Sequence, residues 1–236
     1  ALGKEGYRLN IGKHVTVTAA TTQGAFWATR TLLQLSEQNK ALPKGETVDV
    51  PVYELRGFMI DVARKFMPID YLNDLVKVMA YYKMNALQVH LNDNGFRQFF
   101  GNDWDKTPSA FRLESDVPGL TATDGYYTKD EIRDVIAFCK EKHIEVIPEI
   151  DMPGHSKYFK TTFGFEMATE QGMAVLEKCL KEFFEEIPKE DCPYIHIGSD
   201  EVKAADPEGK GCARYFWEYP VLSGIQRKNI SMRWIV

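Results

Sequence analysis

The first fifty residues change from a period-two pattern to a helical one. Residues 7–11 and 14–18 alternate between apolar and polar positions on either side of Gly12-Lys13, which predicts a β-hairpin. Residues 24–38 place apolar side chains at helical spacing, so we expect a helix that packs on the hairpin. Residues 39–55 contain prolines and a glycine and predict a linker with a short strand.

The sequence pattern changes at Arg56, after which short β-favouring apolar runs alternate with helical patterns. The runs are Gly57–Val62, Ala86–Leu91, Ile144–Ile150 and Tyr194–Ile197. The helical patterns cover Tyr71–Lys83, Ile132–Lys142 and Ala168–Ile187. Asp70 is the expected N-cap of the first, and a capping box at 128–131 precedes the second. This alternation predicts a parallel sheet with crossover helices, and we find no GxGxxG motif or phosphate loop. The predicted fold is α/β, a TIM-type barrel of which the chain supplies four or five β/α units.

Composition narrows the classes of function. The chain has 236 residues, of which 44% are hydrophobic, enough for a sizeable core. The net charge is -5 without a long basic run, which argues against a nucleic-acid partner. No apolar stretch approaches the length of a membrane span. The four cysteines form no CxxC pair and support neither a metal site nor a disulfide scaffold, and two lie in helical patterns that predict buried thiols, Cys139 and Cys179.

Ionisable residues follow each of the four apolar runs. In chain order they include Arg64, Asp93, Asp151, His155, Asp200 and Glu201. Active sites of β/α barrels lie at the carboxyl ends of the strands, so we expect these side chains to meet at one face. A single strand end with acidic residues would be a common surface feature. Four successive strands that all end in ionisable residues predict a functional site. Asp200 and Glu201 are adjacent and can point to opposite sides of an extended chain, which allows them two different roles.

Four segments at these strand ends resemble glycoside hydrolase family 20, the β-N-acetylhexosaminidases. They are RGFMIDVARKF, HLNDNGF, EVIPEIDMPGHS and HIGSDEV, and they occur in the family's order. The resemblance covers residues 56–202 and extends weakly to 6–38. It implies two domains: residues 1–50 as the C-terminal part of a small α/β domain, and residues 51–236 as an incomplete β/α-barrel catalytic domain.

The resemblance implies an enzyme that removes terminal β-linked N-acetylhexosamine, GlcNAc or GalNAc, without a cofactor. Glu201 aligns with the general acid/base, and Asp200 with the acid that orients the substrate's 2-acetamido group. That group's carbonyl oxygen attacks the anomeric carbon and forms an oxazolinium intermediate, a substrate-assisted retaining route. The expected partner is a glycan that ends in N-acetylhexosamine, and the expected location is periplasmic or extracellular, although Ala1–Lys4 show no signal peptide.

The remaining site residues also follow from the resemblance. Arg64 aligns with the arginine that binds hydroxyls of the terminal sugar, and Asp151 is a weaker substrate-binding candidate. Asp93 and His155 align with a hydrogen-bonded chain that ends at Glu201. His90, Glu149 and His196 are expected in the barrel interior. A metal-dependent hydrolase that uses His90, Asp93 and His155 is a weaker alternative, because the resemblance explains these residues without a metal.

The sequence departs from the family in three places. Asn92-Asp93-Asn94 replaces a more usual acidic pair, and Ser199 stands where a second glycine is common. After Val202 only residues 203–236 remain, with one further candidate strand at 230–236, although a whole barrel takes about 250 residues. An alternative function is therefore a catalytically impaired sugar-binding or structural remnant. Because a partial barrel exposes sheet edges, we expect an oligomer or a poorly soluble protein.

The segment 95–127 is long for a loop and rich in aromatic residues. Long loops at this face of a barrel often shape the pocket or contact the leaving group. The alternative is that the aromatic side chains anchor the loop in a small core of its own. The sequence leaves these two interpretations open.

Overall fold

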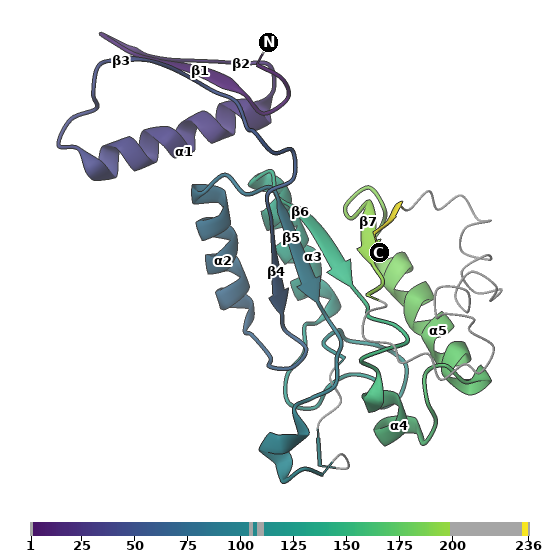
Figure 1. Cartoon of the computed structure of the whole chain (residues 1–236). Helices are drawn as coiled ribbons and strands as arrows, with labels where there is room; N and C mark the ends of the chain where they lie inside the picture. Colours follow the sequence, from purple (N-terminus) through teal and green to yellow (C-terminus); the bar gives the residue numbers. More distant parts are fainter. Residues whose placement is uncertain (1, 104–105, 108–110, 199–232, 236) are drawn as a thin grey trace. The chain divides into compact units, whose positions relative to one another are not determined.

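The computed structural model describes residues 2–103, 106–107, 111–198 and 233–235 (Figure 1). The chain divides into two compact units, and each is described by itself. The first unit comprises residues 1–58, 70–86 and 138–145. The second unit comprises residues 59–69, 87–137 and 146–236 and holds the candidate site.

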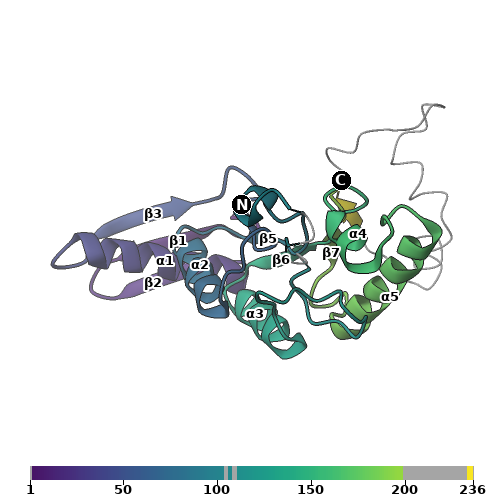
Figure 2. The same cartoon turned by 90° about the horizontal axis from the view of Figure 1, so that it is seen from below.

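Within the first unit, residues 7–49 form a three-stranded antiparallel sheet and a helix. The strands are β1 (Tyr7–Ile11), β2 (Val15–Ala19) and β3 (Gly45–Asp49), in the order β2-β1-β3. Helix α1 (Thr22–Gln38) runs along one face of this sheet, as Figures 1 and 2 both show. The predicted hairpin and helix are confirmed, and the short strand of the linker is β3.

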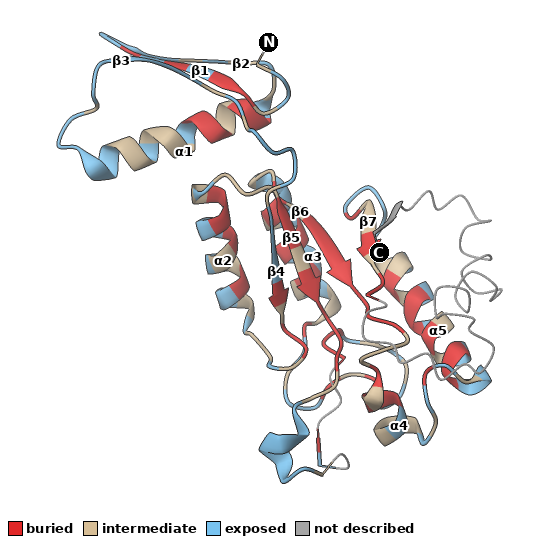
Figure 3. Ribbon diagram, viewed as in Figure 1, coloured by how far each residue is buried: buried red, intermediate tan, exposed pale blue. Residues whose placement is uncertain are grey.

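Alternation along β1 builds the small core of this unit. Tyr7, Leu9 and Ile11 point to the same side and are buried against Trp27 and Ala28 of α1. The intervening positions of β1 are exposed on the other face, as expected for a sheet with one solvated side (Figure 3). The pattern of apolar positions therefore determines which face α1 covers.

Helix α2 (Ile69–Tyr81) corrects one detail of the sequence analysis. Asp70 was expected as its N-cap but lies in the first turn, because the helix already begins at Ile69, directly after Pro68. An acid in the first turn still interacts favourably with the helix dipole. The spacing predicts an apolar stripe of Leu72, Leu75, Val76 and Met79; the helix buries three of these, while Leu75 is half-buried and Ala80 is buried in addition.

A second sheet has five strands in the order β4-β5-β6-β7-β8. Their bounds are β4 Gly57–Asp61, β5 Ala86–His90, β6 Glu145–Glu149, β7 Tyr194–His196 and β8 Arg233–Ile235. The pairs β6–β7 and β7–β8 are parallel, and the arrows of β4, β5 and β6 point the same way in Figure 1. The central strands β5 and β6 are mostly buried, which explains their nearly continuous apolar sequence (Figure 3). Each of the four predicted runs forms a strand.

Three further α-helices and a short 3-10 helix complete the described fold. They are α3 (Lys129–Glu141), α4 (Lys157–Phe163), α5 (Glu170–Glu186) and the 3-10 helix η1 (Arg97–Phe100). The predicted capping box opens α3: Thr128 Oγ1 accepts from the amide of Glu131 at 3.1 Å, and Glu131 Oε2 accepts from the amide of Thr128 at 2.8 Å. Figures 1 and 2 both show α5 beside β7.

Two predictions from composition can be compared with the described residues. Cys139 and Cys179 are buried free thiols, as predicted, and so is Cys192; Cys212 lies outside the described residues. No helix in the described part of the chain is both long enough and apolar enough to cross a membrane.

Candidate active site

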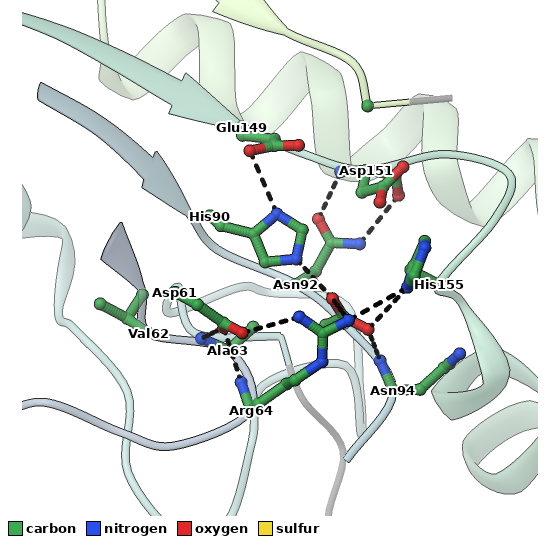
Figure 4. A network of polar contacts seen from close by, with 12 residues as sticks. Asp61, Val62, Ala63, Arg64, His90, Asn92, Asn94, Glu149, Asp151 and His155 are labelled. Atoms are coloured by element: carbon green, nitrogen blue, oxygen red, sulfur yellow. Dashed lines mark hydrogen bonds and ion pairs between the residues drawn. The ribbon is translucent and has the colours of Figure 1, made fainter. Parts of the chain in front are cut away.

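Polar side chains from the carboxyl ends of β4, β5 and β6 meet within the second unit (Figure 4). Three of the predicted site residues, Arg64, Asp93 and His155, contact one another directly. Asp200 and Glu201 lie outside the described residues. The fold thus brings together Arg64, Asp93 and His155, which are far apart in the sequence and were predicted to meet because each follows a strand.

Asp93 is the centre of this network. It is 1% exposed. Its Oδ2 lies 2.7 Å from Arg64 Nη2 and 2.6 Å from His90 Nε2, and its Oδ1 lies 3.0 Å from His155 Nδ1. Oδ1 also accepts from the amide of Asn94 at 2.5 Å. One buried carboxylate therefore orients an arginine and two histidines.

Arg64 is held by two carboxylates. Asp61 Oδ1 accepts from the amides of Ala63 and Arg64, both at 3.0 Å, which closes a tight turn at the end of β4. Asp61 Oδ2 accepts from Arg64 Nη1 at 2.8 Å, while Arg64 Nη2 contacts Asp93. The Arg64 side chain keeps 28% of its surface exposed, so a ligand can reach the fixed guanidinium.

His90 is buried between the carboxylates of Asp93 and Glu149. Its Nε2 faces Asp93, and its Nδ1 lies 3.1 Å from Glu149 Oε2. Burial alone would lower the pKa of His90, but hydrogen bonds with Asp93 and Glu149 outweigh burial and raise the pKa to about 10. Burial would raise the pKa of Glu149, but hydrogen bonds with His196, His90 and Gln88 hold that pKa well below its usual range. The predicted interior placement of His90 and Glu149 is confirmed, and both are charged at neutral pH.

We expect the protonation of His90 to make stability depend on pH. Its folded-state pKa of about 10 exceeds the ordinary value of 6.5, so its contribution is present in full below pH 6.5 and is lost as the pH rises towards 10. Nitrogen-15 NMR should find both ring nitrogens of His90 protonated at about pH 8, where an unperturbed histidine is neutral. A neutral ring at that pH would contradict this assignment.

One group of described residues has the spacing of metal ligands: ligand atoms of His90, Glu149 and Asp151 lie within 4.8 Å of one another. Both ring nitrogens of His90 face carboxylates, Asp93 and Glu149. This group shares only His90 with the metal-dependent alternative, whose other residues were Asp93 and His155, and that alternative stays a prediction.

Asp151 is fixed from two sides. The Asn92 side chain donates to the Asp151 carbonyl at 2.8 Å and accepts from its amide at 2.7 Å, which ties the ends of β5 and β6 together. Gly198 has a φ of +64°, and a Cβ there would lie 1.9 Å from Asp151 Oδ1. The glycine of the fourth segment is thus required both by its backbone conformation and by the carboxylate beside it. The Asp151 side chain is buried. Its contact with the sugar stays a prediction.

Sequence reasoning gave no role to Asp61, Gln88 and Asn92. Asp61 stands three residues before Arg64, a spacing that favours the observed turn and could have indicated it. Gln88 gave no comparable signal, because its partner Glu149 is 61 residues away in the sequence. Asn92 belongs to the second strand-end segment, but its pairing with the Asp151 backbone could not be inferred from that segment alone.

The aromatic residues of the segment 95–127 divide into two sets. Phe111 is buried and anchors the segment. Phe96, Phe99 and Phe100 on or beside η1 are exposed, and the Phe96 ring lies 5.4 Å from the Arg64 guanidinium carbon. Trp104 lies outside the described residues. Both interpretations of this segment thus receive support from different residues.

Comparison with known proteins identifies relatives of both parts of the chain. The model of the glycosyl hydrolase family 20 catalytic domain matches residues 53–163, and that of the same family's domain 2 matches residues 1–50. A beta-hexosaminidase of Akkermansia muciniphila is 39% identical over 165 residues, which are 66% of this chain and 33% of that protein.

Solved structures agree with the sequence relatives. The β-N-acetylhexosaminidase of Streptomyces coelicolor A3(2) matches with a TM-score of 0.72 and 26% identity, over 95% of this chain and 50% of that one. An exo-β-N-acetylglucosaminidase of Vibrio harveyi, solved with N-acetylglucosamine, matches with a TM-score of 0.68 and 25% identity, over 96% of this chain and 39% of that one.

These similarities confirm the predicted fold class and the family resemblance. The chain covers between 21% and 33% of the length of the first three curated relatives, so it corresponds to part of each of them. Two models of one family account for residues 1–50 and 53–163, and the strand-end segments lie in the order predicted from the sequence. The chain belongs to glycosyl hydrolase family 20.

Proposed function

We propose that the site is that of a β-N-acetylhexosaminidase, which removes terminal β-linked GlcNAc or GalNAc from a glycan. The observation that carries the proposal is the Arg64 guanidinium, fixed between Asp61 and Asp93 and beside His155 at the carboxyl ends of the strands. The Akkermansia muciniphila relative is named a beta-hexosaminidase, and the Vibrio harveyi structure contains N-acetylglucosamine, which supports this substrate class. A periplasmic or extracellular location stays a prediction.

Arg64 would bind hydroxyl groups of the terminal sugar. A guanidinium is planar and presents its donors in a rigid fork, which suits two neighbouring hydroxyls better than a lysine ammonium does. Asp61 and Asp93 already hold this group in place, so little orientation has to be gained when the sugar binds. Its partial exposure is compatible with direct contact.

Glu201 would protonate the glycosidic oxygen, in the role that the family resemblance assigns to it. Asp93 and His155 would support it: with His155 Nδ1 beside Asp93 Oδ1 at 3.0 Å, Nε2 of the same ring would face Glu201. Such a chain can raise or lower the pKa of the acid, which must hold a proton near neutral pH.

The first step would use the substrate's own nucleophile. The acetamido carbonyl oxygen attacks the anomeric carbon while the bond to the leaving group breaks and Glu201 delivers its proton to that group. Asp200 would stabilise the positive charge that develops on the acetamido nitrogen. Water then attacks the oxazolinium intermediate as Glu201 takes up a proton, and the product keeps the β-configuration.

Hydrolysis of two matched aryl glycosides tests this proposal. The 236-residue chain should hydrolyse an aryl N-acetyl-β-D-glucosaminide at least about a hundredfold faster than the aryl β-D-glucoside, because only the first carries the internal nucleophile. The leaving group is the same in both, so its chemistry cancels. Comparable rates for the two substrates would overturn the substrate-assisted proposal.

A further inference from the structure

Arg112 is a buried arginine in the segment between β5 and α3, and it is 2% exposed. An arginine has five N–H donors, and a buried one is costly unless they are paired. All five have partners here. Nε donates to the carbonyls of Val62 and Ala63, and the two Nη atoms reach the Ala63 and Gly125 carbonyls and both oxygens of Asp124.

The carbonyls that Arg112 holds immediately precede Arg64. Its Nε lies 3.0 Å from both the Val62 and Ala63 oxygens, and its Nη2 lies 2.7 Å from the Ala63 oxygen. Val62 and Ala63 lie in the turn that Asp61 closes by accepting from the amides of Ala63 and Arg64 (Figure 4). Asp61 therefore fixes the amides of this turn, and Arg112 fixes its carbonyls.

The following residues are held by the same segment. Tyr127 donates its hydroxyl to the Met67 carbonyl at 2.6 Å. A Cβ on Gly125, whose φ is +143°, would lie 2.5 Å from the Phe66 ring, so the segment packs closely against Phe66. The turn and the residues after it are thus fixed by groups 49 to 60 residues away in the sequence.

The charge of Arg112 is balanced beside this turn. Asp124 accepts from Nη1 at 2.5 Å and from Nη2 at 3.2 Å, a bidentate arrangement. A lysine has three donors around one nitrogen and cannot span the two carbonyls and the carboxylate at once. The position therefore requires the guanidinium shape in addition to a positive charge.

We propose that Arg112 is a positioning residue for Arg64, which fixes the backbone so that the Arg64 guanidinium faces the terminal sugar. Arg112 is buried and acts through the Val62 and Ala63 carbonyls, without touching the sugar itself. This inference rests on the proposed function, because it assumes that Arg64 binds the sugar.

A double-mutant cycle with N-acetylglucosamine tests the inference, with dissociation constants from ligand-observed NMR. Arg112→Lys should raise the dissociation constant about tenfold, because a small displacement of a binding group is costly. In an Arg64→Ala background the same substitution should change the constant less than about twofold, since the group it positions is gone. A purely structural role would weaken binding by the same factor in both backgrounds.

Arg56→Lys is the matched control. Arg56 also donates to backbone carbonyls, those of Tyr53 and Lys83, but it lies in the first unit. Hydrogen exchange should become faster in residues 61–67 for Arg112→Lys and stay unchanged there for Arg56→Lys. The control should also bind N-acetylglucosamine like the wild type.

The outcomes separate this inference from the proposed function. If the wild-type chain does not bind N-acetylglucosamine, the proposed function and the inference both fall. If it binds and Arg112→Lys binds equally well, or the factor is the same in both backgrounds, the inference alone is overturned. Should Arg112→Lys not fold, Asp124→Asn takes its place in the same double-mutant cycle. This variant keeps Arg112 but removes the charge of its partner, so it should raise the dissociation constant by a smaller factor.

Discussion

The Glu201→Gln variant is expected to hydrolyse an aryl N-acetyl-β-D-glucosaminide about 10²–10⁴ times more slowly than the wild type, the usual contribution of a general acid/base. Glutamine has nearly the same size as glutamate but cannot donate the proton that the leaving group requires. Binding of N-acetylglucosamine should change little, because Arg64 and its partners are intact. Initial rates and binding titrations measure the two effects separately.

Glu190→Gln provides the control for that experiment. Glu190 is an exposed acid shortly before β7, so the variant removes one negative charge from the same region of the sequence. It should retain the wild-type rate. Undiminished turnover by Glu201→Gln would remove Glu201 from the mechanism, and an equal loss in both variants would point to a general effect of charge.

The Asp93→Asn variant is expected to lower the free energy of unfolding by about 3 kcal/mol, since it removes the carboxylate from a buried ion-pair network. Arg64 would keep Asp61 as a partner, but His90 would lose the nearer of its two carboxylates. Binding of N-acetylglucosamine should weaken as well, because the Arg64 guanidinium would be held on one side. Urea unfolding and binding titrations measure these two losses.

Asp74→Asn is the comparison for this variant. Asp74 pairs with Lys77 at 2.8 Å on the exposed face of α2, where an ion pair contributes less than about 1 kcal/mol. Its unfolding free energy should therefore stay close to that of the wild type. Equal stabilities of Asp93→Asn and Asp74→Asn would show that Asp93 is not the centre of the network.

Local patterns made much of the fold predictable. Each β-strand before residue 198 except β3 was visible as alternation or as a short apolar run, and β3 was expected only as a short strand within residues 39–55. The Thr128–Glu131 spacing indicated where α3 begins. Helix α4 and the 3-10 helix η1 were missed, because seven and four residues are too few to display a helical period. These failures concern short elements whose formation depends on tertiary contacts.

Site residues were predictable where they directly follow a predicted strand. Arg64, Asp93 and His155 were chosen for that position and do contact one another. Arg112 was not chosen, because its partners at Val62 and Ala63 lie 50 and 49 residues earlier in the sequence. The one local signal was its place between Phe111 and Leu113, both buried, which is typical of a short extended segment.

The comparison of the two aryl glycosides is the most direct test of a substrate-assisted hexosaminidase site. It asks whether the acetamido group, which the proposed mechanism uses as its nucleophile, is required for turnover. The account predicts that the N-acetyl-β-D-glucosaminide is hydrolysed at least about a hundredfold faster than the β-D-glucoside. Equal hydrolysis of both, or of neither, would contradict it.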